Sequence, residues 1–130
     1  MTITINDETL AGKLLNKIKI EVQSETITLK DLIAARVQAE VEAYNQKSKD
    51  YFNGLVIPVQ AEKTLNGYKL KDGNSKIDIE QQTFIAWDAF QKNGYFVLID
   101  DEQAEDLEQE LLVNENTSIS FVKLTPLVGG

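Results

Sequence analysis

The residues of this sequence whose types and spacing suggest chemistry are two consecutive glycines, Gly129 and Gly130, at its carboxyl end. They follow an alternating, strand-like run, residues 117–124, after a short link that contains Pro126. Glycines pack no side chain and lose much conformational entropy on ordering, so the pair contributes little to stability. A backbone without Cβ atoms can instead thread a narrow channel and present a carboxylate to a reactive centre in another protein. The pair indicates either such a carboxylate or an ordinary frayed terminus.

A second candidate for chemistry is the acidic segment of residues 100–110. Its carboxylates are those of Asp100, Asp101, Glu102, Glu105, Asp106, Glu108 and Glu110. Carboxylate oxygens bind Ca²⁺, but the run lacks the Asp/Asn spacing and the turn glycine of a twelve-residue calcium loop. Neighbouring side chains of an extended segment point in opposite directions, so Asp100 and Asp101 are not expected to form an acid–base pair. We expect a solvated loop held to the core by Leu107, with neither a metal site nor a catalytic residue.

The composition excludes most familiar active sites. The 130 residues include no cysteine and no histidine, so the chain lacks a thiol nucleophile and the commonest general base and metal ligand. We therefore expect a protein that is not an enzyme and that binds no cofactor of its own. A formal net charge of −8 repels phosphate backbones and disfavours nucleic acid as a partner.

No segment of the sequence suggests a membrane. The longest uninterrupted apolar run, residues 95–99, is far short of a membrane span. The first residues lack the basic and apolar regions of a signal peptide. These observations predict a soluble, cytoplasmic protein.

The elements that must position the glycine pair begin with a hairpin and a helix. Residues 2–5 and 17–22 alternate with period two, which predicts two paired strands. A helix is predicted from Thr28, whose hydroxyl can cap the first backbone N–H groups, to about Tyr44. Its apolar residues recur at three- and four-residue steps and must face the sheet; they are Leu29, Leu32, Ile33, Val37, Val41 and Tyr44.

Residues 45–93 form an inserted segment with a less regular pattern. Three turn signals indicate that part of it is hairpin-like; they are Asn53-Gly54, Asn66-Gly67 and Asp72-Gly73. A second helix is predicted from Asp78 to a stop at Asn93-Gly94. Its three aromatic residues at helical spacing are expected in the core rather than in a ligand groove; they are Phe84, Trp87 and Phe90.

Two further strands, residues 95–99 and 117–124, complete the set. A right-handed connection through the first helix places the last strand beside the first and parallel to it. We predict an α+β fold in which a mixed sheet packs on a helix. Residues 1–124 are expected to form a single domain with the insertion at about 45–93, and residues 125–130 a flexible tail.

Both ends of the chain resemble the β-grasp superfamily of ubiquitin-like and sulfur-carrier proteins. Residues 19–27 and the capped helix are similar to the second strand, bend and helix start of ubiquitin-like proteins. Residues 114–121, followed by Val128-Gly129-Gly130, look like the final turn, strand and tail of sulfur carriers such as the small subunit of molybdopterin synthase. The resemblance covers roughly residues 1–44 and 95–130, and the middle of the chain does not share it.

This resemblance implies a bacterial-type ubiquitin-like modifier. An activating enzyme would use ATP to adenylate the carboxylate of Gly130, and the activated carbonyl would then be transferred to protein amines. Gly129 would keep the chain narrow next to the reacting residue. Leu127 and Val128 would be the tail side chains that this enzyme recognises. Conjugating and deconjugating enzymes and target proteins are the further partners implied.

Two alternatives remain open. The residues before the diglycine are Pro126, Leu127 and Val128 rather than basic ones, which is closer to a sulfur carrier that forms a C-terminal thiocarboxylate for cofactor biosynthesis. The other alternative is a binding module that docks a partner without chemistry. Val122 and Leu124 are candidates for a partner surface, because Val122 should lie on the outer face of the sheet, although each could equally be an ordinary exposed apolar residue.

Overall fold

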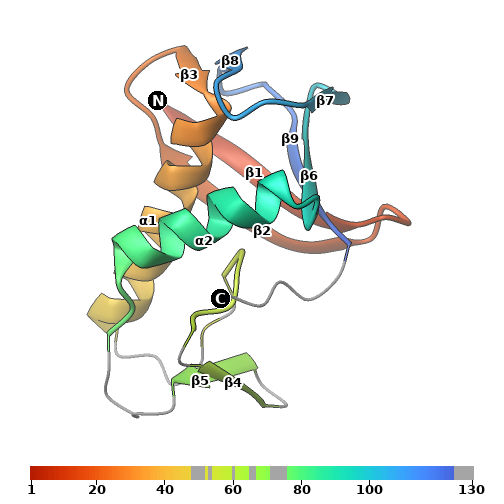
Figure 1. Cartoon of the computed structure of the whole chain (residues 1–130). Helices are drawn as coiled ribbons and strands as arrows, with labels where there is room; N and C mark the ends of the chain where they lie inside the picture. Colours follow the sequence, from red (N-terminus) through yellow and green to blue (C-terminus); the bar gives the residue numbers. More distant parts are fainter. Residues whose placement is uncertain (48–51, 53, 60, 65–66, 71–75, 125–130) are drawn as a thin grey trace.

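The computed structural model describes residues 1–47, 52, 54–59, 61–64, 67–70 and 76–124 (Figure 1). The protein has an α+β fold, as predicted from the sequence. Its elements are β1 (Thr2–Thr9), β2 (Leu14–Glu21), β3 (Thr26–Thr28), α1 (Leu29–Lys47), β4 (Ala61–Thr64), β5 (Gly67–Leu70), α2 (Ile79–Gln91), β6 (Tyr95–Ile99), β7 (Glu102–Ala104), β8 (Glu110–Leu112) and β9 (Ile119–Lys123). The predicted turn at Asp72-Gly73 and the predicted tail, residues 125–130, lie outside the described residues.

The main sheet has five strands in the order β2-β1-β9-β6-β7. β1 pairs with β2 in antiparallel fashion, with Ile3 opposite Ile20. β9 pairs with β1 in parallel, with Ile5 opposite Ile119, and with β6 in antiparallel fashion. The parallel pairing of the last strand with the first, predicted from the handedness of the connection, is therefore confirmed.

One face of this sheet forms the core together with the helices. Strand residues alternate between two faces, so every second residue of the central strands turns toward the helices and is buried. These residues include Ile3, Ile5, Tyr95, Val97, Ile119 and Phe121. The apolar stripe of α1 packs onto them, and α2 lies across α1 (Figure 1). The predicted packing of a mixed sheet on the first helix is present, and the second helix lies in the same layer as the first.

Both helices begin at the predicted residues. The Thr28 hydroxyl accepts a hydrogen bond of 3.1 Å from the Asp31 N–H at the start of α1. Asp78 caps α2 by accepting from two backbone N–H groups of the first turn. The helix stops because Asn93 adopts a positive φ of 60°, and the Gly94 N–H then donates to the Ala89 carbonyl.

The prediction that the aromatic residues of α2 are core residues is wrong for Phe84, which is 66 % exposed. Trp87 and Phe90 are partly buried at the edge of the core. The helix instead buries Gln82, Thr83 and Ala86. These smaller or polar residues allow a close approach, because the Gln82 amide and the Ala86 carbonyl both form buried hydrogen bonds to neighbouring segments.

The insertion is partly hairpin-like, as expected. β4 and β5 pair in antiparallel fashion, and Phe52 forms an isolated bridge with Tyr68. The turn signals Asn53-Gly54 and Asn66-Gly67 are described only at their glycines. Apolar residues of the insertion enter the core; they are Phe52, Leu55, Val56 and Ile57. The inserted segment therefore completes the core rather than lying apart from it.

All seven carboxylates of the acidic segment are exposed, as the sequence predicts, but the segment is not simply a loop. It contains the short edge strand β7, and Glu110 begins β8, which pairs with β3 in a separate two-stranded sheet. Leu107 is partly buried, and its carbonyl accepts a hydrogen bond from the Lys30 N–H, so its predicted role as the apolar anchor is confirmed. Within the described part of the chain, no helix is both long and apolar enough to cross a membrane.

Candidate functional site

The end of β9 is the last described part of the chain before the diglycine. β9 lies between β1 and β6, and its last residue, Lys123, is opposite Thr9 on one side and Tyr95 on the other. Leu124 is the last described residue. The described chain therefore ends beside the middle strand of the sheet, next to the turn that joins β1 to β2. Leu127, Val128, Gly129 and Gly130, the predicted reacting and recognition residues, lie outside the described residues.

The two candidate residues for a partner surface, Val122 and Leu124, are less exposed than expected. Val122 lies on the outer face, opposite Glu8 and Phe96, because Phe121 faces the helices. It is only 9 % exposed, so the expectation of an exposed residue is wrong for Val122. A strand with neighbours on both sides is covered by their side chains. Leu124 is partly buried, and the role of both residues in a partner surface stays a prediction.

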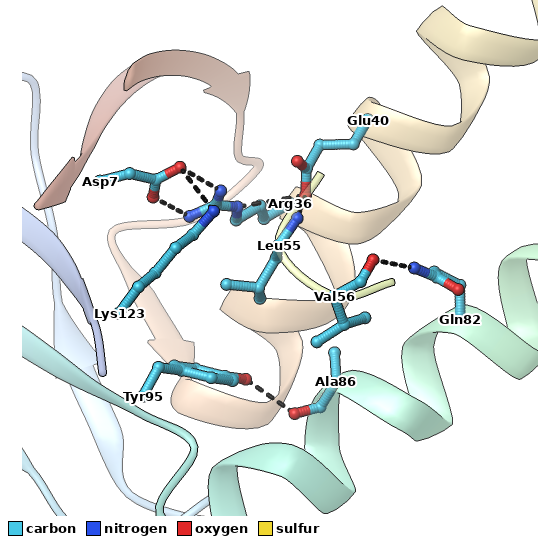
Figure 2. A network of polar contacts seen from close by, with 9 residues as sticks. All are labelled: Asp7, Arg36, Glu40, Leu55, Val56, Gln82, Ala86, Tyr95 and Lys123. Carbon is cyan, nitrogen blue, oxygen red and sulfur yellow. Dashed lines mark hydrogen bonds and ion pairs between the residues drawn. The ribbon is translucent and has the colours of Figure 1, made fainter. Parts of the chain in front are cut away.

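A buried network of charged side chains lies directly beneath the end of β9 (Figure 2). Arg36 of α1 and Asp7 of β1 are 0 % and 1 % exposed. The two guanidinium Nη atoms donate to the two Asp7 carboxylate oxygens at 2.5 and 2.6 Å. The Arg36 Nε donates to Glu40 Oε1 at 3.2 Å, and the guanidinium carbon lies 4.7 Å from the centre of the Phe121 ring. Three of the five guanidinium N–H groups thus have a carboxylate acceptor, and the aromatic ring of Phe121 lies close to the guanidinium carbon.

These charged residues occur at the same strand and helix periodicities as the apolar core residues, so they point into the core as well. Asp7 follows Ile3 and Ile5 on the inward side of β1. Arg36 lies three residues after Ile33 on the buried stripe of α1, and Glu40 follows one turn later. Arg36 is the only arginine of the chain. The sequence analysis missed this network, although charged residues at apolar positions of two periodic patterns were a signal that could have revealed it.

The network shifts the pKa values of its members. Burial lowers the pKa of Arg36, but the carboxylates of Glu40 and Asp7 outweigh burial, so the net pKa is raised and the guanidinium stays charged. Burial raises the pKa of Tyr95, while Arg36 opposes this shift and Glu40 adds to it. The Tyr95 hydroxyl donates to the Ala86 carbonyl at 2.7 Å, which fixes the neutral phenol against α2.

Lys123 links this network to the end of β9. Its Nζ lies 3.7 Å from Asp7 Oδ2, and Figure 2 shows the side chain reaching along the sheet toward the carboxylate. Burial lowers the pKa of Lys123, and the Asp7 carboxylate opposes that shift. The last residue of β9 is therefore held to the core by its backbone ladder and by its side chain.

The insertion is attached to the same network. The Leu55 N–H donates to Glu40 Oε1 at 3.2 Å, and Gln82 Nε2 donates to the Val56 carbonyl at 2.6 Å (Figure 2). These charged groups satisfy one another at hydrogen-bonding distance, so we assign them a structural role. They fix the insertion, α1 and the end of β9 relative to one another.

Among the described residues, no group of three or more acidic side chains has the arrangement of a metal site, and this includes the acidic segment 100–110.

In comparisons with known proteins, no family model, curated protein or solved structure matches this chain.

Proposed function

We propose that this chain is a β-grasp modifier of the ubiquitin-like type, activated at the carboxylate of Gly130 and transferred to protein amines. The observation that carries the proposal is the sheet order β2-β1-β9-β6-β7, with β9 parallel to β1 and α1 packed on one face. A ubiquitin-like sheet has a hairpin, a helix and a central last strand in this relation. In this chain that strand ends at Lys123, and Gly130 follows seven residues later in the sequence.

The reaction requires no catalytic group from this chain. A Gly130 carboxylate oxygen attacks the α-phosphorus of ATP on the activating enzyme, and pyrophosphate leaves. A target amine then attacks the activated carbonyl, an amide bond forms, AMP leaves, and the amine loses its proton. The chain supplies a reactive end that is narrow at Gly129 and Gly130, with Leu127 and Val128 as contacts for the activating and conjugating enzymes.

The attachment of Lys123, the last residue of β9, fits this role. A segment that is handed from one enzyme to another must extend from a fixed base, since motion of the base would cost entropy at each encounter. Lys123 provides such a base through its strand pairing and its contact with Asp7. Pro126 cannot donate to a sheet ladder, which favours the end of strand pairing before the tail.

The sequence supplies a sharp test of conjugation. Trypsin cleaves after Lys123, so a target lysine joined to this chain would carry the branch Leu-Thr-Pro-Leu-Val-Gly-Gly, residues 124–130. We expect peptides with this branch in digests of cells that express the chain with an amino-terminal tag. The control is the same chain without Gly129 and Gly130. The proposal is wrong if no branched peptide appears while the tagged chain accumulates, or if adducts persist in the deletion variant.

A sulfur carrier is the second candidate, and the residues Leu127 and Val128 before the diglycine favour it. In that case the adenylate is attacked by a sulfur donor, and the chain ends in a thiocarboxylate. The intact mass of the protein isolated from its own cells should then exceed the carboxylate form by the difference between sulfur and oxygen. If only the carboxylate is found, and binding to partners survives loss of Gly129 and Gly130, a binding module without chemistry explains the data better.

A further inference from the structure

A groove of about 420 Å³ lies at the end of the sheet opposite to the last residue of β9, Lys123. It is formed by the end of β2, by β3, by the first two turns of α1 and by the start of β8. Glu21 lines it and pairs with Thr2, whereas Lys123 at the end of β9 pairs with Thr9. These two ends of β1 are about 23 Å apart along the strand. The groove is therefore a separate surface, and its capacity to bind a partner is independent of the function proposed for the tail.

The floor of the groove is apolar. It is formed by Val22, which is 4 % exposed, and by the partly buried side chains of Ile27 and Ala35. These three side chains give the groove an apolar base for the stem of a bound side chain.

The rim of the groove is acidic. Glu21, Asp31 and Glu110 line it, and no lysine or arginine among the residues that the structure describes does so. The Thr2 hydroxyl lowers the pKa of Glu21 by hydrogen bonding, and the amino-terminal ammonium lies 3.4 Å from its carboxylate. Asp31 and Glu110 form no ion pair with any residue in the described part of the chain, so their charges are available to a partner.

We propose that this groove docks a lysine or arginine side chain of a partner protein. Such a side chain has an apolar stem, which matches Val22, Ile27 and Ala35, and a cationic head, which matches the carboxylates of the rim. β2 is the outermost strand of the sheet, and no described strand pairs with its outer edge, so an extended segment that carries the basic residue can lie beside that edge. The partner chemistry is thus a basic residue flanked by apolar ones in an extended segment.

The test is a titration of the isotope-labelled full chain with the peptide acetyl-Val-Arg-Val-Arg-Val-amide, followed by amide NMR. The matched peptide with glutamine in place of arginine is the ligand control. The charge variant is Asp31→Asn with Glu110→Gln. Its control is Glu102→Gln with Glu105→Gln, which removes two charges at the opposite edge of the sheet. The third variant, Ala35→Leu, fills the groove without a change of charge.

We expect saturable shifts confined to the amides around the groove, and none with the glutamine peptide. The charge variant should weaken binding about fivefold, as expected for the loss of two partly exposed ion pairs. Ala35→Leu should weaken it without any change in net charge, and the control variant should match the wild type. Since Ala35→Leu leaves the helix-capping residues intact, it keeps the test decisive if the charge variant folds poorly.

Three results would overturn the proposal. One is equal weakening by both charge variants, because that indicates general attraction to an acidic surface. Another is the absence of saturable shifts up to about 1 mM peptide with a folded protein. The third is movement of the same amides when the protein alone is concentrated, because a second copy of the chain then occupies the groove.

Discussion

Removal of one partner from the buried Arg36–Asp7 pair should destabilise the protein more than most single substitutions. In Asp7→Val, the guanidinium stays buried and keeps only Glu40, at 3.2 Å, as a carboxylate partner. Breaking a buried ion pair costs about 3–5 kcal/mol, and because Glu40 remains we expect the lower end, about 3 kcal/mol. In Arg36→Met, Asp7 keeps only Lys123 at 3.7 Å, so we expect about 4 kcal/mol.

The double variant, Asp7→Val with Arg36→Met, should be more stable than the two single losses predict. It leaves no charge at either position, and apolar side chains can pack where the pair was. Glu40 loses Arg36 as its partner and keeps the hydrogen bond from the Leu55 N–H. We expect a favourable coupling energy of about 3 kcal/mol between the two substitutions. The free energy of unfolding of all four proteins, from urea titrations at about pH 7, measures this coupling. A loss of about 3 kcal/mol also lowers the melting temperature by roughly 10 °C in a domain of this size.

A surface ion pair of the same chain supplies the control. Lys92 Nζ lies 2.8 Å from Asp88 Oδ2, and both side chains are exposed. Lys92→Met should cost no more than about 1 kcal/mol, and salt should reduce this loss. The effect of Asp7→Val should be unchanged by salt, because the pair is buried. If Asp7→Val costs less than about 1 kcal/mol, or if its effect disappears in high salt, the reasoning about this pair is refuted.

Three further substitutions test other contacts. Tyr95→Phe should cost about 1 kcal/mol near neutral pH, because the hydrogen bond to Ala86 is lost. Burial raises the folded pKa of Tyr95 above its unfolded value, so wild-type stability is fully present below about pH 10 and falls as pH rises further, and the advantage over the variant should shrink there. Gln82→Leu should leave the Val56 carbonyl without its donor, cost about 1–3 kcal/mol and speed hydrogen exchange in residues 54–59. Asp78→Ala should cost about 1 kcal/mol by the loss of the α2 cap, measured by thermal unfolding.

Each of these three expectations has its own contrary outcome. Parallel stability curves of the wild type and Tyr95→Phe, measured from about pH 8 to well above the ordinary tyrosine pKa, would show that the phenol is not protected by burial. Uniform acceleration of exchange in Gln82→Leu, rather than acceleration centred on the insertion, would mean that the amide does not anchor this segment. An Asp78→Ala variant as stable as the wild type would show that the first turn of α2 needs no cap.

The features that could be predicted from the sequence are those set by neighbouring residues or by general rules of chain geometry. Thr28 and Asp78 start the helices as expected, since a capping side chain satisfies backbone N–H groups that have no other partner. The parallel pairing of β9 with β1 followed from the handedness of the connection through α1. These features depend on neighbouring residues or on general chain geometry, so they could be read without tertiary contacts.

The misread features depend on contacts between distant segments. Phe84 is exposed because α2 turns Gln82 and Ala86 inward, an orientation set by the partners Val56 and Tyr95 rather than by helix periodicity. Glu110 belongs to a strand because β3 offers it a ladder. Of the candidate site, the diglycine was found from residue types, but the charge network beneath the strand that leads to it was not. Its members come from separate segments of the chain and meet only in the folded protein.

The central place of β9 in the sheet has a consequence for biosynthesis. The hairpin of β1 and β2 and the pair of β6 and β7 both depend on β9 to join them, since β1 and β6 are not neighbours. A nascent polypeptide that has not yet delivered residues 119–123 outside the ribosome can form its helices and hairpins but cannot close its sheet. Until then Ile5 of β1 and Val97 of β6 lack their partners Ile119 and Phe121 in β9. The edges of β1 and β6 that β9 would occupy therefore stay open to pairing with other chains. Chaperone contact during synthesis should therefore persist until residues 119–123 emerge, and should be prolonged by any substitution that weakens the pairing of β9.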